Sequence, residues 1–346
     1  VALMSLSSGL EGSAQAFGVV LLLIASLCYG LSINIATPLS QRYGSLPVMA
    51  RMLALATMWT APFGLRDQLD SQFDWGALIA VVVVWQMLQF HAAVGLLLNT
   101  LSLLVLGGLG WFIVARCNAV ERSRMIVLIV LTMSTVVFWA LFEQSAASMT
   151  LFADRVMDRE VFGLSLTASQ YGALNSMFIF MFAPFFAWLW TVLGSRGLEP
   201  STPVKFALGI AQAGLGFGAL VVGAANPDEA GLVSGYWMVL AYLLHTCGEL
   251  CLSPVGLSAV TKLAVPSVVG VMMGSWFLAT AYSEFVAAQL AKLAALETSA
   301  GSITDTAAAL TSYGELFNSL FWLGLGVGAL MLLLSPVLRR MMHGIH

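Results

Sequence analysis

Long apolar runs alternate with short polar segments along almost the whole chain. A run of about 20 mostly apolar residues is long enough to cross the hydrocarbon core of a bilayer. Runs of this kind, bounded by charges, Pro or Gly clusters, occupy residues 16–37, 47–64, 76–89, 93–115, 126–149, 170–192, 204–223, 236–258, 268–291 and 314–336. Unpaired backbone groups are too costly in lipid and period-2 alternation is absent, so each run is predicted to be a helix. The pattern predicts an all-α, polytopic membrane protein with about 9–10 transmembrane helices, of which 76–89 is short for a span.

Composition agrees with a protein that is dissolved in lipid. Charged residues make up 9% of the chain and hydrophobic residues 60%, with a mean hydropathy of +0.92, whereas about a quarter of a soluble domain is charged. The net charge is −3 and there are no basic blocks, so we expect no nucleic-acid partner. The expected partners are the lipid bilayer and small molecules.

Cofactor and enzyme chemistry find little support in the sequence. The four cysteines, Cys28, Cys117, Cys247 and Cys251, lack the spacing of a disulfide framework or a zinc site and are predicted to be apolar packing residues. The sequence contains no H-E-x-x-H, G-x-S-x-G or paired-Asp protease motif. The opening segment "VALMSLSSGLEGSAQAFG" has no basic stretch before an apolar run, so no cleavable signal peptide is expected. We therefore expect no enzyme, no cofactor and no metal.

The distribution of basic residues predicts orientation, because cytoplasmic loops carry an excess of Lys and Arg. From residue 116 onward, one side of the membrane would hold Arg116, Arg122, Arg124, Arg196, Lys205, Lys262, Arg339 and Arg340, and the other only Arg155, Arg159 and Lys292. This part is predicted to be six helices with both ends in the cytoplasm, here the cytoplasmic face of the cell (inner) membrane. In the preceding part, counting the spans backwards places the loop that holds Arg42 outside, against the tendency of basic residues to lie inside. This conflict suggests that the two parts have different origins.

Ionisable side chains inside predicted spans are candidates for function, since each costs roughly 2.5–3.5 kcal/mol at a helix centre. Glu143, Glu249, Glu284 and His245 stand out in this respect. Each of the three acids could also be neutral and simply lock two helices together. His245 lies one turn before Glu249 on the same helical face and could be a packed helix contact or a proton relay.

Three long segments carry a family resemblance. They are "FWALFEQSAAS", "SQYGALNSMFIFMFAPFFAWLW" and "GELCLSPVGLSAVTKLAVPSVVGVMMGSWFLATA". They resemble the seventh, eighth, tenth and eleventh helices of the proton-dependent oligopeptide transporter (POT) family, a branch of the major facilitator superfamily. The resemblance covers about residues 90–346. It implies a six-helix C-terminal bundle, preceded by part of the helical hairpin that bacterial members carry between their two bundles.

The resemblance implies roles for particular residues. Glu143 matches the acid of the family's E-Q motif, which is implied to form a switchable ion pair with a basic residue of the other bundle. Asn175 and Glu249, the latter in the G-E-L motif, are implied to hold the amino terminus of a peptide. The implied side-chain pockets are lined by aromatic residues that match Trp139, Trp276 and Phe277. Proton-coupling candidates are Glu143, Glu249, Glu284 and His245.

The sequence departs from the family pattern in two places. After "WFLATA" the family usually has a small polar or Asn-containing segment, whereas this chain has "YSEFVAAQ" with Glu284. An extra acid there could change the proton stoichiometry or seal helix contacts. The family's E-x-x-E-R motif of the first helix is absent from this sequence, so we expect the N-terminal bundle to be missing.

The first part of the chain resembles another family. The segments Gly18 to Leu65 and "FDWGALIAVVVV", within about residues 17–83, resemble the second repeat of the drug/metabolite transporter superfamily. The sequence thus predicts an N-terminal transmembrane segment (1–75), a helical hairpin or linker (76–118) and a six-helix bundle (119–346). Natural fusion, truncation and a sequence-assembly error would each explain the junction.

The function that these resemblances imply is a proton-coupled di- and tripeptide symporter, represented mainly by its C-terminal substrate-binding bundle. Its partners would be di- and tripeptides, protons and a separate N-terminal transporter bundle. Two alternatives remain open at the level of sequence. One is a non-transporting fusion or subunit, and the other is an exporter of the drug/metabolite type.

Overall fold

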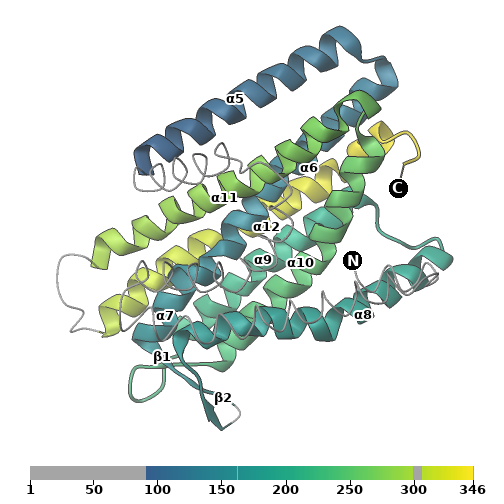
Figure 1. The fold of residues 1–346 in the computed structure, drawn as a ribbon. Helices are drawn as coiled ribbons and strands as arrows, with labels where there is room; N and C mark the ends of the chain where they lie inside the picture. Colours follow the sequence, from purple (N-terminus) through teal and green to yellow (C-terminus); the bar gives the residue numbers. More distant parts are fainter. Residues whose placement is uncertain (1–90, 162, 299–305, 346) are drawn as a thin grey trace, which may run out of the picture. The chain divides into compact units, whose positions relative to one another are not determined.

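Long helices dominate the fold, as the sequence predicts. The computed structural model describes residues 91–161, 163–298 and 306–345 (Figure 1). Its helices are α5 (His91–Arg116), α6 (Ala119–Phe142), α7 (Ser148–Val156), α8 (Ala173–Ser195), α9 (Thr202–Ala225), α10 (Tyr236–Leu263), α11 (Val269–Thr298) and α12 (Thr306–Met341). The predicted all-α class is confirmed.

Six segments of this part of the chain are long and apolar enough to cross a membrane. They are Val94–Arg116, Ala119–Val156, Ala168–Ser195, Thr202–Ala225, Tyr236–Leu263 and Thr306–Met341. Each overlaps one of the runs found by hydropathy almost completely, and α11 includes all but the first residue of the predicted span 268–291. The predicted spans 16–37, 47–64 and 76–89, and Arg42, lie outside the described residues.

The chain divides into two compact units. One boundary between them lies within α5, between Leu101 and Ser102. Helices α6 to α12 all belong to the unit that continues from Ser102. At the end of α5, Arg122 donates a hydrogen bond to the carbonyl of Val114 (3.1 Å). Asn118 caps α6, because its Oδ1 accepts from Val120 N and Glu121 N, while its own backbone N donates to Glu121 Oε2. The domain boundary expected at residue 118 stays a prediction.

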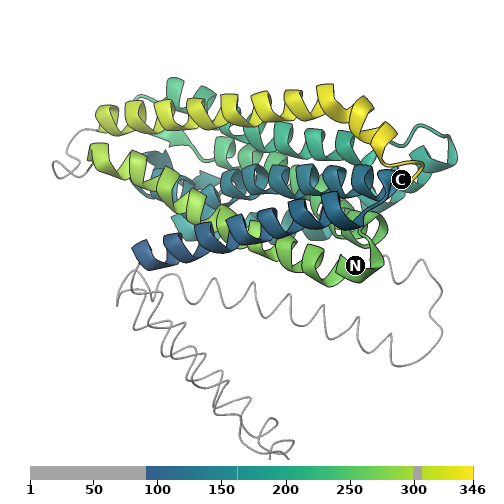
Figure 2. The ribbon, with the colours of Figure 1, turned by 90° about the horizontal axis from the view of Figure 1, so that it is seen from above.

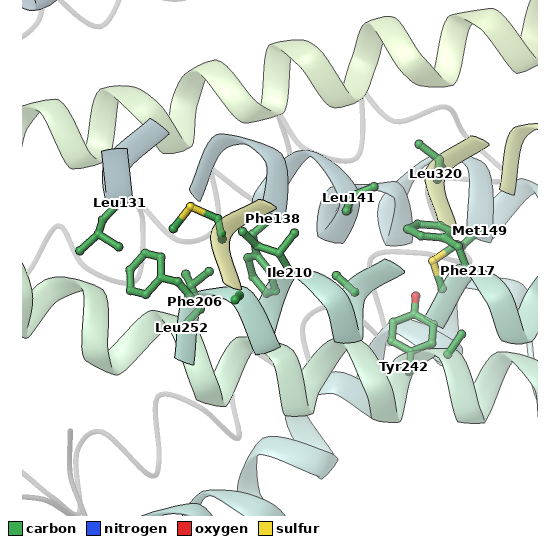
Figure 3. Packing of buried hydrophobic residues seen from close by; sticks show 14 of the residues in the cluster. Leu131, Phe138, Leu141, Met149, Phe206, Ile210, Phe217, Tyr242, Leu252 and Leu320 are labelled. Carbon is green, nitrogen blue, oxygen red and sulfur yellow. The ribbon is translucent and has the colours of Figure 1, made fainter. Parts of the chain in front are cut away.

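Helix α9 has the most extensive packing in the bundle, against α10 and α12, and it also contacts α6 (Figure 2). Helix α6 packs in addition against α11, and α8 packs against α10. The shared core is made of large apolar side chains that are removed from solvent, among them Phe138, Leu141, Ile210, Phe217 and Leu252 (Figure 3). Burying several such side chains holds the helices in a fixed arrangement.

Two short pairs of strands connect the helices at one end of the bundle. Strand β1 (Met157–Asp158) pairs in parallel with β4 (Val233–Ser234), and β2 (Glu160–Val161) forms a hairpin with β3 (Leu164–Ser165). The β1–β4 pair joins the segment before α8 to the segment before α10. Helical turns η2 (Ala168–Gly172) and η3 (Pro266–Val268) lead into α8 and α11.

The predicted continuous helix over 126–149 is broken in the structure. Helix α6 ends at Phe142 and is followed by a 3-10 turn, η1 (Glu143–Ala146). Ala147 then has φ −119° and ψ −97°, outside the helical region, before α7 begins. Apolar periodicity cannot show such a break, because the run stays apolar on both sides of it. The break places the E-Q dipeptide of Glu143 and Gln144 at a helix end inside a span.

Candidate functional site

Three of the predicted acids meet at the break in the first helix of the bundle. Glu143, the first residue of η1, is close enough to the carboxyl group of Glu284 on α11 to interact with it electrostatically. The carboxyl group of Glu249 on α10 is close enough to interact electrostatically with Glu143. The site therefore brings carboxyl groups from η1, α10 and α11 close to one another.

Asn175 joins α8 to α10 next to these acids. Its Nδ2 donates to Glu249 Oε2 (3.0 Å) and to Thr246 Oγ1 (3.2 Å). Thr246 Oγ1 donates in turn to the carbonyl of Tyr242 (2.7 Å), one turn earlier on α10. The side chains of Asn175 and Glu249 are both half-buried. A carboxylate and an amide are thus fixed side by side between two helices, an arrangement that suits an organic cation.

Gln144 fixes the turn that carries Glu143. It is fully buried, its Nε2 donates to the carbonyl of Ala287 on α11 (3.0 Å), and its Oε1 accepts from Ser148 Oγ (2.8 Å). Ala287 lies one turn after Glu284, so this bond brings the two carboxyl groups together. Sequence reasoning missed Gln144 as a positioning residue, although a buried amide beside an intramembrane acid was the available signal.

One carbonyl group at the helix break, that of Ser145, accepts from side-chain donors. Ser145 O accepts from Thr150 Oγ1 (2.7 Å) and from Tyr242 OH (3.4 Å). Inside a membrane a broken helix is tolerated where side chains satisfy its backbone in this way. The break is therefore a stable part of the site.

The predicted aromatic residues have different environments. Trp139 is half-buried on α6 and makes edge contacts with Phe138 and Phe142, at 5.3 Å between ring centroids in each case. Trp276 is 5% exposed and packs on Phe206, at 6.3 Å between ring centroids, and on Gly256. Phe277 is 63% exposed. Trp276 thus lies in the core, while Phe277 is exposed and Trp139 is half-buried; a substrate-binding role for each of the three stays a prediction.

His245 is 1% exposed and faces α9. Its Nε2 lies 2.9 Å from the carbonyl of Ala213, and its ring lies 4.9 Å from that of Phe217 and 6.1 Å from that of Phe142. An imidazole Nε2 next to a carbonyl acts as the donor, so this nitrogen carries a hydrogen. These contacts are those of a helix-packing residue. A role of His245 in proton transfer stays a prediction.

The comparisons with known proteins agree with this geometry. The POT family model matches residues 77–311. The chain belongs to the POT family. A Bacillus subtilis relative, "Uncharacterized transporter YclF", is 36% identical over 265 residues, which cover 77% of this chain and 49% of the relative.

Two further proteins are similar to this chain over most of its length. "Dipeptide and tripeptide permease B" of Aeromonas hydrophila is 31% identical over 333 residues, covering 90% of this chain and 65% of the permease. A crystal structure of a mutant peptide transporter POT in complex with alafosfalin matches with a TM-score of 0.70 at 27% identity, covering 96% of this chain and 70% of that one. The chain thus spans about half to two thirds of the length of these two relatives.

The family assignment settles the general class of the protein. It is a multi-pass membrane protein of a transporter family and not an enzyme, as the sequence predicts. The resemblance of residues 17–83 to drug/metabolite transporters lies outside the described residues and stays a prediction. The individual roles of the predicted site residues also stay predictions.

Proposed function

We propose that this chain provides the substrate-binding bundle of a proton-coupled di- and tripeptide symporter. The observation that carries the proposal is the hydrogen bond from Asn175 to Glu249, which fixes a carboxylate and an amide between α8 and α10. The names of several relatives, which are dipeptide and tripeptide permeases, support the same substrate class. A free peptide carries an ammonium group at one end, and this group needs such acceptors.

The physical reason lies in the cost of moving a cation out of water. An ammonium group that enters a low-dielectric site loses its hydration and needs a charged, well-placed acceptor in return. Glu249 supplies the charge. The amide of Asn175 and the hydroxyl of Thr246 hold Glu249 in place, so little freedom is lost when the peptide binds.

Proton coupling is proposed for the acids at the helix break. Glu143, Glu284 and Glu249 lie close enough for their charges to interact, so a proton taken up by this cluster would change the electrostatic balance at all three. A peptide ammonium group at Glu249 would change the electrostatic balance at Glu143, which links substrate binding to protonation. Among the four candidates, His245 has the least support, because its ring faces α9.

The proposed contact at Glu249 is tested by removing its charge. Glu249→Gln keeps the shape of the side chain and is expected to weaken the binding of dialanine by about 2–5 kcal/mol. N-acetyl-dialanine has no ammonium group and should lose much less. Binding of both ligands to the full chain in nanodiscs can be compared by saturation-transfer NMR. Glu160→Gln is the matched control, because it removes a carboxylate from the exposed hairpin strand β2.

Comparing the loss of binding for the two ligands distinguishes recognition of the amino terminus from a purely structural role of Glu249. Selective loss of dialanine binding in Glu249→Gln, with wild-type behaviour in Glu160→Gln, supports the proposed role. Equal losses for both ligands would mean that Glu249 holds the helices together and does not recognise the amino terminus.

A further inference from the structure

Helix α12 carries an apolar stripe that ends on an arginine. Leu330, Leu333 and Val337 are 53%, 77% and 54% exposed. Arg340 is also exposed, and the four residues follow one another at steps of three, four and three, so they lie on one side of the helix. We call these four residues the α12 stripe. From its first to its last residue the helix rises about 15 Å, which is half the thickness of the hydrocarbon core of a bilayer.

Helix α12 runs antiparallel to α7 and α6. Near the start of α12, the ring of Phe317 lies 5.1 Å from that of Phe152 on α7, measured between centroids. Further along α12, Leu141 of α6 packs on Gly324, where an added Cβ atom would lie 3.1 Å from Leu141 Cδ1. Residue numbers therefore fall on α7 and α6 as they rise on α12.

This antiparallel arrangement brings the start of α6 to the level of the end of α12. Counting an equal number of residues along both helices from the packing contact of α6 with α12 reaches Arg124 on α6 and Met341 on α12. The start of α6 and the end of α12 lie side by side in both views (Figures 1 and 2). Arg124 is therefore at the same level as Arg339 and Arg340.

These three arginines are not neutralised by the described part of the chain. Arg339 and Arg340 are exposed, and their guanidinium groups form no ion pair or side-chain hydrogen bond with residues 91–161, 163–298 or 306–345. Arg124 is half-buried, and its Nε is buried without a hydrogen-bond partner among the same residues. The neighbouring acid Glu121 is occupied in the cap of α6, where it accepts from Asn118 N (2.9 Å). A buried donor without an acceptor is costly, so an anion from outside this bundle is expected here.

We propose that Arg124, Arg339 and Arg340 bind the headgroup phosphate of an anionic phospholipid whose acyl chains lie along the α12 stripe. Guanidinium groups bind phosphate oxygens through paired N–H donors, and basic pockets between transmembrane helices suit anionic headgroups. Three positive charges favour a headgroup with a net negative charge over a zwitterionic one. The inference concerns the bundle itself and does not depend on the proposed peptide site.

The combination of charge and apolar surface favours a lipid over other occupants. A free phosphate ion would use the arginines but not the apolar residues that lead up to Arg340. A second copy of this chain, docked through the same surface, would bring two sets of arginines together, and like charges repel. A phospholipid matches both the charged end and the leaflet-long apolar side of the α12 stripe.

The test measures the affinity of the full chain for single lipids. Native mass spectrometry in detergent follows the binding of phosphatidylglycerol and of phosphatidylcholine with the same acyl chains. The variants are Arg124→Gln and Arg340→Gln. The matched control is Arg159→Gln, which removes the same charge at the hairpin end, where Arg159 forms an exposed ion pair with Asp154 (3.2 Å). Inorganic phosphate and glycerophosphoglycerol, the headgroup without acyl chains, are added as competitors.

We expect the wild-type chain and Arg159→Gln to bind phosphatidylglycerol at least about tenfold more tightly than phosphatidylcholine. Arg124→Gln and Arg340→Gln should each weaken the binding of phosphatidylglycerol by about fivefold, the effect of one basic residue near an anionic headgroup. Neither competitor should displace the lipid at equal concentration. Thermal unfolding checks that each variant is folded; if Arg124→Gln is not, the exposed Arg340→Gln decides.

Two results would overturn the proposal. Equal affinities for the two lipids, or unchanged binding of phosphatidylglycerol by Arg340→Gln, would mean that the arginines do not recognise an anionic headgroup. Displacement of the lipid by inorganic phosphate or glycerophosphoglycerol at equal concentration would show a site for a free anion, in which the α12 stripe has no part.

Discussion

Trp276 and Phe277 are neighbours in sequence and lie in opposite environments. Trp276 packs into the space left by Gly256, where an added Cβ atom would collide with its ring. Phe277 is 63% exposed. On a helix, adjacent residues point about 100° apart, so one can face the core and the next the surface. Only Phe277 of this pair is available to a ligand or a partner.

A pair of alanine variants separates these two roles. Trp276→Ala should lower the free energy of unfolding by about 3–5 kcal/mol, because it leaves a cavity between α9, α10 and α11. Phe277→Ala should change stability little, because its ring is mostly exposed. Thermal or denaturant unfolding in detergent measures both. A stable Trp276→Ala variant with altered peptide preference would instead favour the pocket role that the family resemblance implies.

At the scale of elements, glycines set how closely the helices approach. Gly214 on α9 and Gly324 on α12 lie face to face, and a Cβ atom added at Gly324 would lie 2.5 Å from Gly214 Cα. Gly209 and Gly248 do the same for α9 and α10, where a Cβ atom added at Gly248 would lie 2.6 Å from Gly209 O. Such contacts let helix backbones pack closely within a membrane. The central position of α9 depends on both.

Substitution at one of these crossings should separate the helices. Gly324→Leu is expected to lower the free energy of unfolding by about 1–3 kcal/mol, because the added side chain meets backbone atoms of α9 that cannot move aside. The matched control is Gly326→Leu, two residues further along α12, where an added Cβ atom meets nothing within 4 Å. Unfolding in detergent compares the two. Equal stability of the variants would show that the crossing tolerates separation.

At the scale of the whole molecule, charge separates the two ends of the bundle. Arg339 and Arg340 lie in the last turn of α12, while the β2 and β4 end carries Asp158, Glu160 and Asp228 together with Arg155 and Arg159, so the excess of basic residues lies at the end that holds the C-terminus. Because Lys and Arg are retained in the cytoplasm, the C-terminus is expected to be cytoplasmic. The strand pairs are then expected on the outer face of the inner membrane.

Labelling with a membrane-impermeant maleimide in whole cells tests this orientation. Glu160→Cys, on an exposed strand, should be labelled, and Arg339→Cys should be labelled only after the membrane is opened. The native cysteines are replaced by Ala or Ser in both variants, so that each protein has one reporter. Labelling of Arg339→Cys in intact cells would reverse the orientation.

The sequence by itself determined the membrane class, the helical character and the positions of most spans. These follow from the length of the apolar runs and from the cost of unpaired backbone groups in lipid, neither of which depends on packing. The motifs around Glu143, Asn175 and Glu249 also identified the family, because they are local in sequence. Such features can be predicted from a short stretch of chain alone.

Only the tertiary structure decided how these stretches meet. The break after Phe142 depends on Gln144 reaching Ala287, a residue 143 positions away in the sequence. The burial of Trp276 depends on a glycine of another helix, and the contact of Glu143 with Glu284 joins η1 to α11. Apolar periodicity could not foresee them, because a lipid-facing, a core and a partner-facing residue can all be apolar in a membrane protein. Packing alone distinguishes the three, since it determines which face of each helix the rest of the bundle covers.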